Sequence, residues 1–269
     1  MGSVLLTGAI LVILSTWYAN ALTLSDLYPY GIEHGDTMSN GTDLPEVSIE
    51  PPIDNLVGFS PAGLTGTSYE ISHNGKLDIL NDGDDIIRLL LLQLAGDFSN
   101  TKIYGRSTND AVLIKRAMNQ INEGFPNTFC STSPPSRLII ATWIDYQKTD
   151  TDTGSNFQVI VATNQNITFG IALYVNVHLR TAFTGIGSII NGTSVYQRSF
   201  FPIGTDVASI PNMMSNSNIP GTYITSLNHI PPDPCTEPDC SVVCKAKLLR
   251  MACEAMGIDG KDLPAPCRN

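Results

Sequence analysis

The chain has 269 residues, of which 42% are hydrophobic and 15% are charged. This composition supports one sizeable core, and the length corresponds to roughly one or two domains. The 25 acidic side chains outnumber the 15 lysines and arginines, so the formal net charge is −10, and the basic residues form no cluster in the sequence. Nucleic acids and anionic membrane surfaces both require a basic surface, so neither is expected as a partner.

The first 21 residues, MGSVLLTGAILVILSTWYANA, contain no charged side chain. An apolar stretch at 4–14 leads to Ala-Asn-Ala at 19–21, the small-x-small pattern of a signal-peptide cleavage site. We therefore expect a signal peptide at 1–21 that is cleaved after Ala21, although it lacks the usual basic residue near its start. An uncleaved membrane anchor is the alternative, but polar residues interrupt the apolar stretch before it could span a bilayer. The pattern predicts a secreted, extracellular protein with no membrane insertion after signal cleavage.

Three Asn-x-Thr triplets, at Asn40, Asn166 and Asn191, agree with that compartment. A single triplet is weak support for glycosylation, because chance supplies many. Three of them behind a signal peptide predict N-linked glycans at all three asparagines. Each asparagine also suits a turn, and the two roles are compatible.

The segment YEISHNGKLDI at 69–79 has the pattern of a β-hairpin whose register can be derived. A three-residue loop at 73–75 pairs Ile71 with Leu77 and leaves Gly75 as a left-handed residue. A two-residue loop would instead place Ile71 opposite an aspartate. The sequence therefore predicts the three-residue loop.

A second hairpin is predicted at 157–175, where two apolar runs flank Asn-Gln-Asn. A three-residue loop at 164–166 pairs Val161 with Phe169, and the same register keeps all pairs on one apolar face. Such loops commonly contain a left-handed residue, and Asn166 would tolerate that conformation.

The remaining elements alternate in type along the chain. Strands are expected at 86–96, where helix is the alternative, and at 102–108 and 137–146. An amphipathic helix is expected at 109–121, capped by Asn109 or Thr108. The segments 36–55 and 147–155 are expected to be polar loops. This order predicts an α+β fold that is predominantly an antiparallel β-sheet or sandwich with one or two packed helices.

The composition changes after about residue 230. The tail at 231–269 contains five of the six cysteines, and a short helix is expected at about 240–256. Five cysteines cannot pair among themselves, so an even, intramolecular set of disulfides requires Cys130 to bond one of them. A free Cys130 with an intermolecular bridge from the tail is the alternative, and zinc is disfavoured because the spacings match no usual zinc finger. The disulfide candidates are Cys130, Cys235, Cys240, Cys244, Cys253 and Cys267.

Six stretches, in this order, carry a resemblance to the nidogen-like (NIDO) domain family. They are LYPYG followed by HGD (27–36), YEISHNGKLDI, IYGRSTNDAVLIKRAMNQI, LIIATWIDY, NFQVIVATNQNITFGIALY and SNIPGTYITSL (217–227). One departure is LLQLAGDFS, where the family often has a Pro-Phe-Trp cluster before the aspartate that corresponds to Asp97. The resemblance implies a nidogen-like domain at 22–230, followed by the cysteine-rich tail at 231–269.

The resemblance implies a non-catalytic extracellular interaction module, in cell–matrix adhesion or matrix assembly. Its partners would be matrix or cell-surface proteins, and self-association is left open. The residues themselves show no shared metal spacing among the four histidines, no nucleophile motif and no phosphate loop, so no catalytic residue, metal site or cofactor is expected. NDGDD at 81–85 lacks the glutamate and spacing of an EF-hand, and is expected to end a strand rather than to bind calcium. The alternative function is a secreted hydrolase that uses paired carboxylates such as Asp97 and Asp145.

Overall fold

The structure is a computed structural model that describes residues 21–57, 63–83, 85–96, 98, 100–147 and 153–228. The predicted signal peptide, apart from its last residue, lies outside the described residues. So does the cysteine-rich tail, with its five cysteines and its predicted helix. Cys130 lies in a short helix, but its side chain is not among those described.

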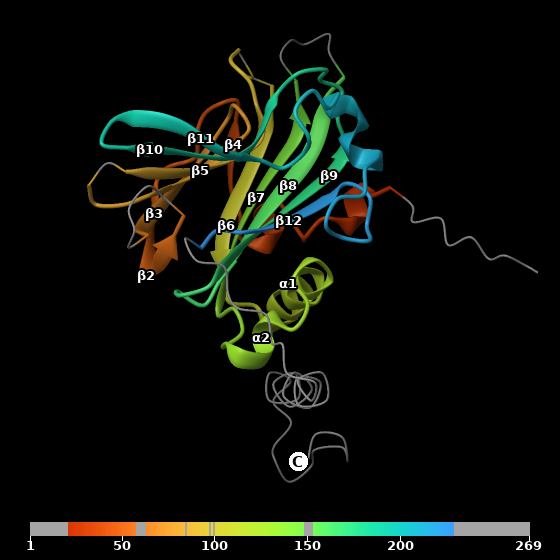
Figure 1. The fold of residues 1–269 in the computed structure, drawn as a ribbon. Coiled ribbons are helices and arrows are strands. Elements are labelled where there is room, and N and C mark those ends of the chain that lie inside the picture. The colour runs from red at the N-terminus through yellow and green to blue at the C-terminus, as the bar shows by residue number, and fades with distance from the viewer. Residues whose placement is uncertain are drawn as a thin grey trace, which may run out of the picture.

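Two antiparallel sheets form the described part of the chain (Figure 1), and each has six strands within it. The first sheet has the order β1 (Thr37–Asn40), β6 (Lys102–Thr108), β7 (Arg137–Tyr146), β8 (Ser155–Thr163), β9 (Thr168–Asn176), β12 (Thr222–Ser226). The second has the order β11 (Thr193–Ser199), β10 (Phe183–Ile190), β5 (Ile86–Gln93), β4 (Lys76–Leu80), β3 (Leu64–Ser72), β2 (Val47–Leu56). The helices are η1 (Leu24–Asp26), η2 (Ile32–His34), α1 (Ala111–Gly124), α2 (Thr128–Ser131) and η3 (Val207–Asn212). The predicted α+β fold, dominated by an antiparallel sandwich, is confirmed.

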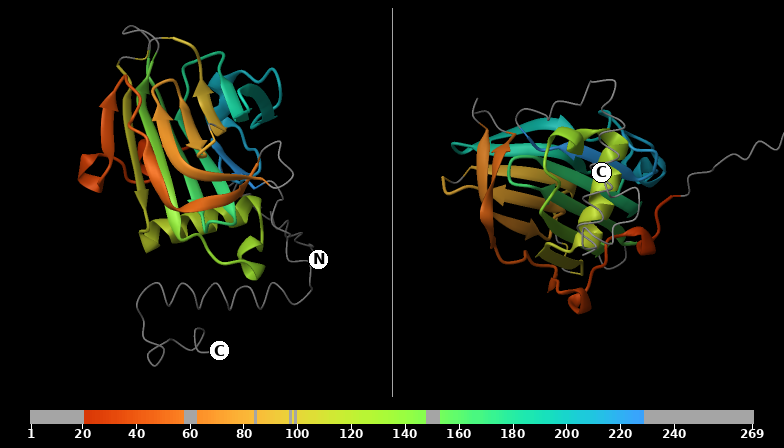
Figure 2. Two further views of the ribbon diagram at one scale, coloured as in Figure 1. Left: turned by 90° about the vertical axis from the view of Figure 1, so that its left-hand side faces the viewer. Right: turned by 90° about the horizontal axis from the view of Figure 1, so that it is seen from below.

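The first sheet is the middle layer of the molecule. One of its faces packs on the second sheet around Trp143 and Phe157, and the other packs under α1, where Ala117 and Ile121 meet Ile160. Figure 2 shows α1 lying against the strands of the first sheet when the molecule is viewed from below. Because both faces are covered, all nine residues of β8 are buried. A strand covered on both sides reads as a continuous apolar run.

Three aromatic side chains of the first sheet donate hydrogen bonds to backbone oxygens of the second. Trp143 Nε1 donates to a β3 carbonyl at 3.0 Å, and the hydroxyls of Tyr146 and Tyr174 donate to β5 carbonyls at 2.8 and 3.0 Å. Phe157 packs among them, stacked on Trp143 with ring centroids 5.0 Å apart. Each polar tip is therefore satisfied where the aromatic ring is buried, which fixes the two sheets relative to each other. Trp143 is fully buried.

Gln158 attaches the N-terminal segment to the first sheet. Its side-chain oxygen accepts from the backbone N–H of Tyr28 at 2.7 Å. Its amide nitrogen donates to the carbonyl of Tyr28 at 3.0 Å and to the hydroxyl of Thr142 at 2.8 Å. The guanidinium of Arg116, on α1, lies 4.1 Å from the centre of the Tyr28 ring. Burial raises the pKa of the Tyr28 hydroxyl above its usual value, so this residue stays neutral.

The predicted register of the 69–79 hairpin is confirmed. Ile71 pairs with Leu77, Ser72 pairs with Lys76, and Gly75 has φ +81°. Apolar residues of this hairpin face the first sheet while polar residues alternate with them, so the period of two could be read from the sequence.

The predicted register of the 157–175 hairpin is wrong. Thr163 pairs with Thr168, which makes the loop four residues long, and Phe169 lies opposite Ala162 rather than Val161. The left-handed residue is Gln165, with φ +81°, not Asn166. Since both faces of β8 and β9 are buried, an apolar face could not distinguish one register from the next.

The predicted polar loop at 36–55 is also wrong, because β1 and most of β2 occupy it. β2 is an edge strand, where prolines such as Pro51 and Pro52 remove no ladder hydrogen bond that a neighbour needs. The helix predicted at 109–121 is present at 111–124, but its N-cap is Asp110. The Asp110 carboxylate accepts from the backbone N–H groups of Val112 and Leu113 in the first turn, at 2.8 and 3.0 Å.

The remaining predicted strands are confirmed. β6 and β7 have the predicted bounds, and the run at 86–96 is strand from Ile86 to Gln93 rather than helix. The expected loop at 147–155 ends at Ser155, where β8 begins, and residues 148–152 lie outside the described chain.

Candidate functional site

Asp36 and His34 lie two residues apart but contact different residues. Asp36 is buried, and its carboxylate accepts hydrogen bonds from Arg106 Nη1 at 2.5 Å and from the backbone N–H of Gly31 at 2.7 Å. His34 is exposed, and its ring contacts only the neighbouring Glu33 at 3.9 Å among the described residues. Asp36 therefore holds the N-terminal loop against β6.

Of the paired carboxylates of the alternative hydrolase, one lies in the described part of the chain. Asp145 lies on the surface, half exposed, with Lys102 Nζ at 3.3 Å. Asp97 lies outside the described residues. Within the described ranges, no group of three or more His, Cys, Asp or Glu side chains has the arrangement of a metal site. Asn81 Oδ1 accepts from the backbone N–H groups of Gly83 and Asp85, so β4 ends in a turn that begins at Asn81, as expected.

A carboxyl pair lies at the β3–β4 end of the second sheet. Asp43 Oδ1 accepts from the backbone N–H of His73 at 2.7 Å and contacts its ring nitrogen at 2.5 Å. Partial burial raises the pKa of Asp43, but the hydrogen bonds from His73 outweigh it and the net pKa is lowered. Burial, followed by the nearby charge of Asp43, raises the pKa of Glu70. The pKa values of the two neighbouring carboxyl groups are therefore shifted in opposite directions.

The three glycan-acceptor asparagines are exposed and lie in turns or at a strand end. Asn40 is the last residue of β1, Asn166 lies in the β8–β9 loop, and Asn191 occupies the β10–β11 turn with φ +49°. Asn191 and Gly192 are both left-handed between paired residues, as a two-residue type I′ turn requires. Exposure is compatible with the predicted glycans, which stay predictions.

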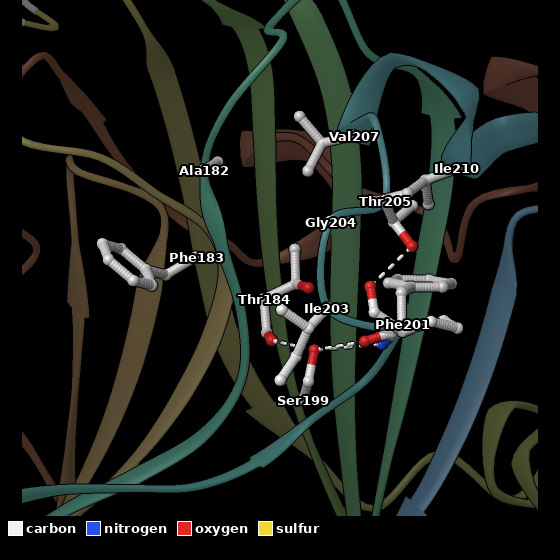
Figure 3. Close-up of a pocket in the computed structure, with 11 residues that line it drawn as sticks. Ala182, Phe183, Thr184, Ser199, Phe201, Ile203, Gly204, Thr205, Val207 and Ile210 are labelled. Carbon is white, nitrogen blue, oxygen red and sulfur yellow. Dashed lines mark hydrogen bonds between the residues drawn. The ribbon is translucent and has the colours of Figure 1, made fainter.

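The site with the clearest capacity for binding is a surface hollow at the start of β10, which we name the β10–η3 hollow. Its volume is about 330 Å³. It is lined by Ala182, Phe183, Thr184, Ser199, Phe201, Pro202, Ile203, Gly204, Thr205, Val207 and Ile210. Figure 3 shows Phe183 on one side, pointing away from the cluster formed by Thr184, Ser199 and Phe201.

Two large apolar side chains of this hollow face solvent. Ile203 is 100% exposed and Phe183 is 61% exposed. Single exposed apolar residues are common on proteins, but two of them at one concave site indicate an interaction surface.

The loop that carries Ile203 is anchored at its start by two aromatic side chains, Phe200 and Phe201. Phe200 is stacked on Tyr223 with ring centroids 4.7 Å apart, and Phe201 packs on Tyr174 at 5.9 Å. Beyond these anchors, the N–H of Thr205 donates to the carbonyl of Pro202 at 3.1 Å, closing a β-turn around Ile203 and Gly204. Gly204 has φ +88°, which glycine adopts without strain at this turn position. The rigid base therefore holds Ile203 outward.

The chemistry of the β10–η3 hollow is that of a binding site. None of its lining residues has an ionisable side chain of the acid–base kind. Its serine, Ser199, has hydrogen-bond partners that are backbone groups among the described residues: the hydroxyl accepts from the Phe201 N–H and lies 2.5 Å from Phe201 O and 3.4 Å from Thr184 O, to either of which it can donate. With no base beside it, this hydroxyl is not an activated nucleophile.

Sequence reasoning had not identified this hollow. A weak signal was present in FFPIG at 200–204, where two anchoring aromatics precede a turn. The sequence gives no indication that Ile203 faces solvent, because that depends on where the loop lies over β9 and η3.

The nidogen-like domain model, NIDO, matches residues 85–225 of the 269. The chain belongs to this family. The match runs from the start of β5 almost to the end of β12 and includes all of the β10–η3 hollow. The nidogen-like family is one of extracellular, non-enzymatic modules.

Neither the curated proteins nor the solved structures yield a match to this chain. Among the helices of the described ranges, none has the length and apolar character needed to cross a membrane.

Proposed function

We propose that this nidogen-like protein is secreted and acts as a non-catalytic interaction module in cell–matrix adhesion or matrix assembly. Its partners would be extracellular matrix or cell-surface proteins. The observation that carries the proposal is the β10–η3 hollow, in which Ile203 and Phe183 are presented to solvent on an anchored loop and strand.

The energetic argument rests on these two side chains. Burying a large apolar side chain against a partner contributes about 1.5–3 kcal/mol. A rigid loop adds little ordering entropy on binding, so most of that gain is retained. Such a pair can therefore form the centre of a modest interface, with polar residues around it.

The predicted glycans would leave this hollow accessible. Asn191 lies at the far end of β10 from Phe183, roughly 25 Å away at about 3.3 Å per residue. Asn166 lies at the opposite end of β9 from Tyr174, which contacts the hollow residue Phe201. Asn40 is on β1, four strand positions from β9, which is roughly 20 Å at about 4.8 Å per strand.

The test is binding of the purified, glycosylated protein to matrix deposited by cultured cells, measured by biolayer interferometry. We expect saturable binding that Ile203→Ser weakens about tenfold and Phe183→Ser weakens further, as expected for loss of apolar burial. Val112→Ser is the matched control, because Val112 is 76% exposed but lies on α1, away from the hollow. Equal binding by all variants would contradict the proposed site, and absence of binding by the wild type would contradict the function.

Secretion, processing and disulfide bonding belong to the same proposal. N-terminal sequencing of the mature protein should begin Leu-Thr-Leu-Ser, and glycosidase treatment should remove mass in three steps, for Asn40, Asn166 and Asn191. Non-reducing peptide mapping should link Cys130 to one cysteine of the tail at 231–269. An alkylatable Cys130 in the native protein, or a mature chain that starts at Met1, would contradict these predictions.

A further inference from the structure

A second hollow lies at an open side of the sandwich, and we name it the β2–β6 hollow. Its volume is about 300 Å³. It is lined by residues at the start of β1, in the β1–β2 connection, and in β2, β3 and β6, among them Leu44, Val47, Tyr69, Arg106 and Ser107. β2 is the last strand of the second sheet, and beyond β6 the described part of the first sheet has only the short strand β1. The hollow shares no lining residue with the β10–η3 hollow, so it is a separate site.

A valine that faces the core is left uncovered in this hollow. Val47 lies directly opposite Tyr69 on β3, and opposite residues place their side chains on the same face of a sheet. Tyr69 belongs to the core between the two sheets, so Val47 also faces the first sheet. Tyr69 is 3% exposed, yet Val47 is 41% exposed. No strand of the described first sheet therefore covers the second sheet at Val47.

The first sheet borders the same gap at Ser107. A Cβ on Gly105 would meet the side chain of Ile71 on β3, so this face of β6 is directed toward the second sheet. Ser107 is two residues further along β6 and shares that face. Ser107 is exposed and lines the hollow.

The backbone of Ser107 faces the edge of the first sheet. The N–H of Gly41 donates to the carbonyl of Thr101 at 2.8 Å, which marks a hydrogen-bonded pair of the ladder between β1 and β6. In an antiparallel ladder, every second residue directs both its N–H and its C=O to the same neighbouring strand. Counted in twos from Thr101, Ser107 directs both groups to the side on which β1 lies.

β1 ends too early to pair with these groups. Its pairing with β6 ends where Thr37 lies opposite Gly105. Gly35 would be the next partner, but its φ is +85° and its N–H donates to the carbonyl of Ile32. Among the described residues, no hydrogen bond reaches Ser107 from this side. Its N–H and C=O are therefore free to pair with another strand.

The hydroxyl of Tyr69 is a further group without a partner. Although Tyr69 is 3% exposed, its hydroxyl has no hydrogen-bond partner within the described ranges. The hydroxyl is not one of the unpartnered polar atoms that are fully shielded from solvent, so the exposed part of Tyr69 includes it. This exposed part lies in the hollow that Tyr69 lines. Burial raises the pKa of the hydroxyl to about 12, so it is a neutral donor.

The β2–β6 hollow has no unpaired charge in its lining. Arg106 is the charged residue there, and its guanidinium donates to Asp36 at 2.5 Å and to the carbonyl of Pro29 at 2.7 Å. A charged side chain inserted between the sheets would be buried without a counter-ion, so an uncharged side chain is favoured.

We propose that an extended segment of a partner protein adds to the first sheet at Ser107, antiparallel to β6, with an apolar side chain inserted between the sheets against Val47. The segment exchanges two backbone hydrogen bonds with Ser107, and the Tyr69 hydroxyl donates to one of its carbonyls. In such strand addition the backbone supplies affinity and the inserted side chain supplies specificity. The proposal goes beyond the function proposed for the β10–η3 hollow and does not depend on it.

The cysteine-rich tail of the chain is a poor occupant of this site. Its first residues include Pro231, Pro232 and Pro234, which have no N–H to donate to the Ser107 carbonyl. The segment at 240–256 is predicted to be a helix, whereas the site requires an extended backbone. A segment of another protein can meet both requirements.

The experiment uses the full glycosylated chain and fluorescein-labelled peptides of the form Ser-Thr-Thr-X-Thr-Thr-Ser, measured by fluorescence anisotropy. With isoleucine as X, we expect binding about tenfold tighter than with serine or glutamate, because only isoleucine gains from burial between the sheets. N-methylation of the isoleucine keeps the side chain but removes the N–H that the Ser107 carbonyl accepts, so affinity should fall about fivefold. N-methylation of the next threonine, whose N–H points away from β6, is the matched control.

Variants of the protein locate the site. Ser107→Pro removes the N–H that faces the hollow but no hydrogen bond between β6 and β7, because the residues that bond to β7 alternate with it. This variant should bind the isoleucine peptide about fivefold more weakly, whereas Ser107→Ala should bind it as the wild type does. Val47→Ser should reduce the preference for isoleucine over serine, and Ile203→Ser should leave every affinity unchanged. Loss of peptide binding in Ile203→Ser, with wild-type binding in Val47→Ser, would place the segment in the β10–η3 hollow and overturn the proposal.

Hydrogen exchange at the Ser107 amide tests the occupant. We expect fast exchange in the free chain and slow exchange with the isoleucine peptide bound. Slow exchange in a monomeric free chain would mean that the chain itself fills the site. Self-association that Ser107→Pro abolishes, seen by sedimentation, would mean that a second copy fills it, and either result overturns the partner segment.

Two results with the wild type alone also decide against strand addition. One is absence of binding by every peptide, and the other is equal affinity for the isoleucine peptide and its N-methylated form. Because the function proposed for the β10–η3 hollow is tested by matrix binding at Ile203, failure of one test leaves the other proposal standing.

Discussion

Replacing Gln158 by leucine is expected to release the N-terminal segment from the first sheet. The side chain is fully buried and makes three hydrogen bonds, two to the backbone of Tyr28 and one to Thr142. Leucine has a similar size but can neither accept nor donate, so three buried polar groups lose their partner. Each such group costs about 1–3 kcal/mol. Because Thr142 can rotate its hydroxyl, we take the low end, about 3 kcal/mol in total.

The lower free energy of unfolding is measurable by urea denaturation and by thermal melting, and the release of the N-terminal segment by hydrogen exchange. For a domain of this size a loss of 3 kcal/mol corresponds to a fall in melting temperature of roughly 6–12 °C. The amide of Tyr28 should also exchange faster in Gln158→Leu than in the wild type. Gln158→Glu is the comparison at the same position: it keeps an acceptor for the Tyr28 N–H, but it loses the donor and places a carboxyl group in a buried site.

Two results would refute this reasoning. The first is a Gln158→Leu protein as stable as the wild type, since the buried groups would then have found other partners. The second is a Tyr28 amide that exchanges in the wild type as fast as an unstructured peptide, since the segment would not be docked at all. If Gln158→Glu loses more stability than Gln158→Leu, the buried charge, not the lost donor, dominates.

Three further predictions concern local features. Asp110→Ala should lower the free energy of unfolding by about 1 kcal/mol through loss of the α1 N-cap, and Asn109→Ala should change it little. Because the pKa of Glu70 is raised in the folded state, the wild type loses stability as the pH rises through that pKa. Glu70→Gln should therefore be more stable than the wild type near pH 7, by less than about 1 kcal/mol. Below pH 4.5, the pKa of glutamate in the unfolded chain, urea titrations should give the two proteins equal stability. Gly221→Ala should lower the melting temperature more than Gly204→Ala: both glycines are left-handed, but only at Gly221 would a Cβ meet a β9 carbonyl oxygen, at 2.5 Å. Equal losses in Asp110→Ala and Asn109→Ala, a pH-independent effect of Glu70→Gln, or equal effects at the two glycines would contradict the respective assignments.

The sequence by itself determined those elements in which one residue pattern has one structural solution. The register of the 69–79 hairpin followed from alternation, because Ile71 and Leu77 face the core while Glu70 and Lys76 do not. β6 and β7 were bounded by polar and turn-forming residues, so their limits could be read directly. The order of strands and helix, and the motifs along it, identified the nidogen-like fold.

The tertiary structure alone determined the register and the side-chain exposure of elements that are covered on both sides, and of segments held by contacts between distant parts of the chain. β8 and β9 lie between α1 and the second sheet, so burial of both faces removed the alternation that would have set their register. The N-cap of α1 is Asp110 rather than Asn109 or Thr108, because the Asp110 carboxylate accepts from the backbone N–H groups of Val112 and Leu113. Helix ends of this kind are uncertain by a residue or two from sequence alone.

The candidate site belongs entirely to this second class. The β10–η3 hollow combines residues from 182 to 210, and the loop that carries Ile203 is anchored on Tyr174 and Tyr223. Whether Ile203 is exposed or buried depends on the direction in which its anchored loop leaves the core. Local sequence sets the turn that carries this side chain, but only the packing of Phe200 and Phe201 against the sheets sets the direction in which the turn points.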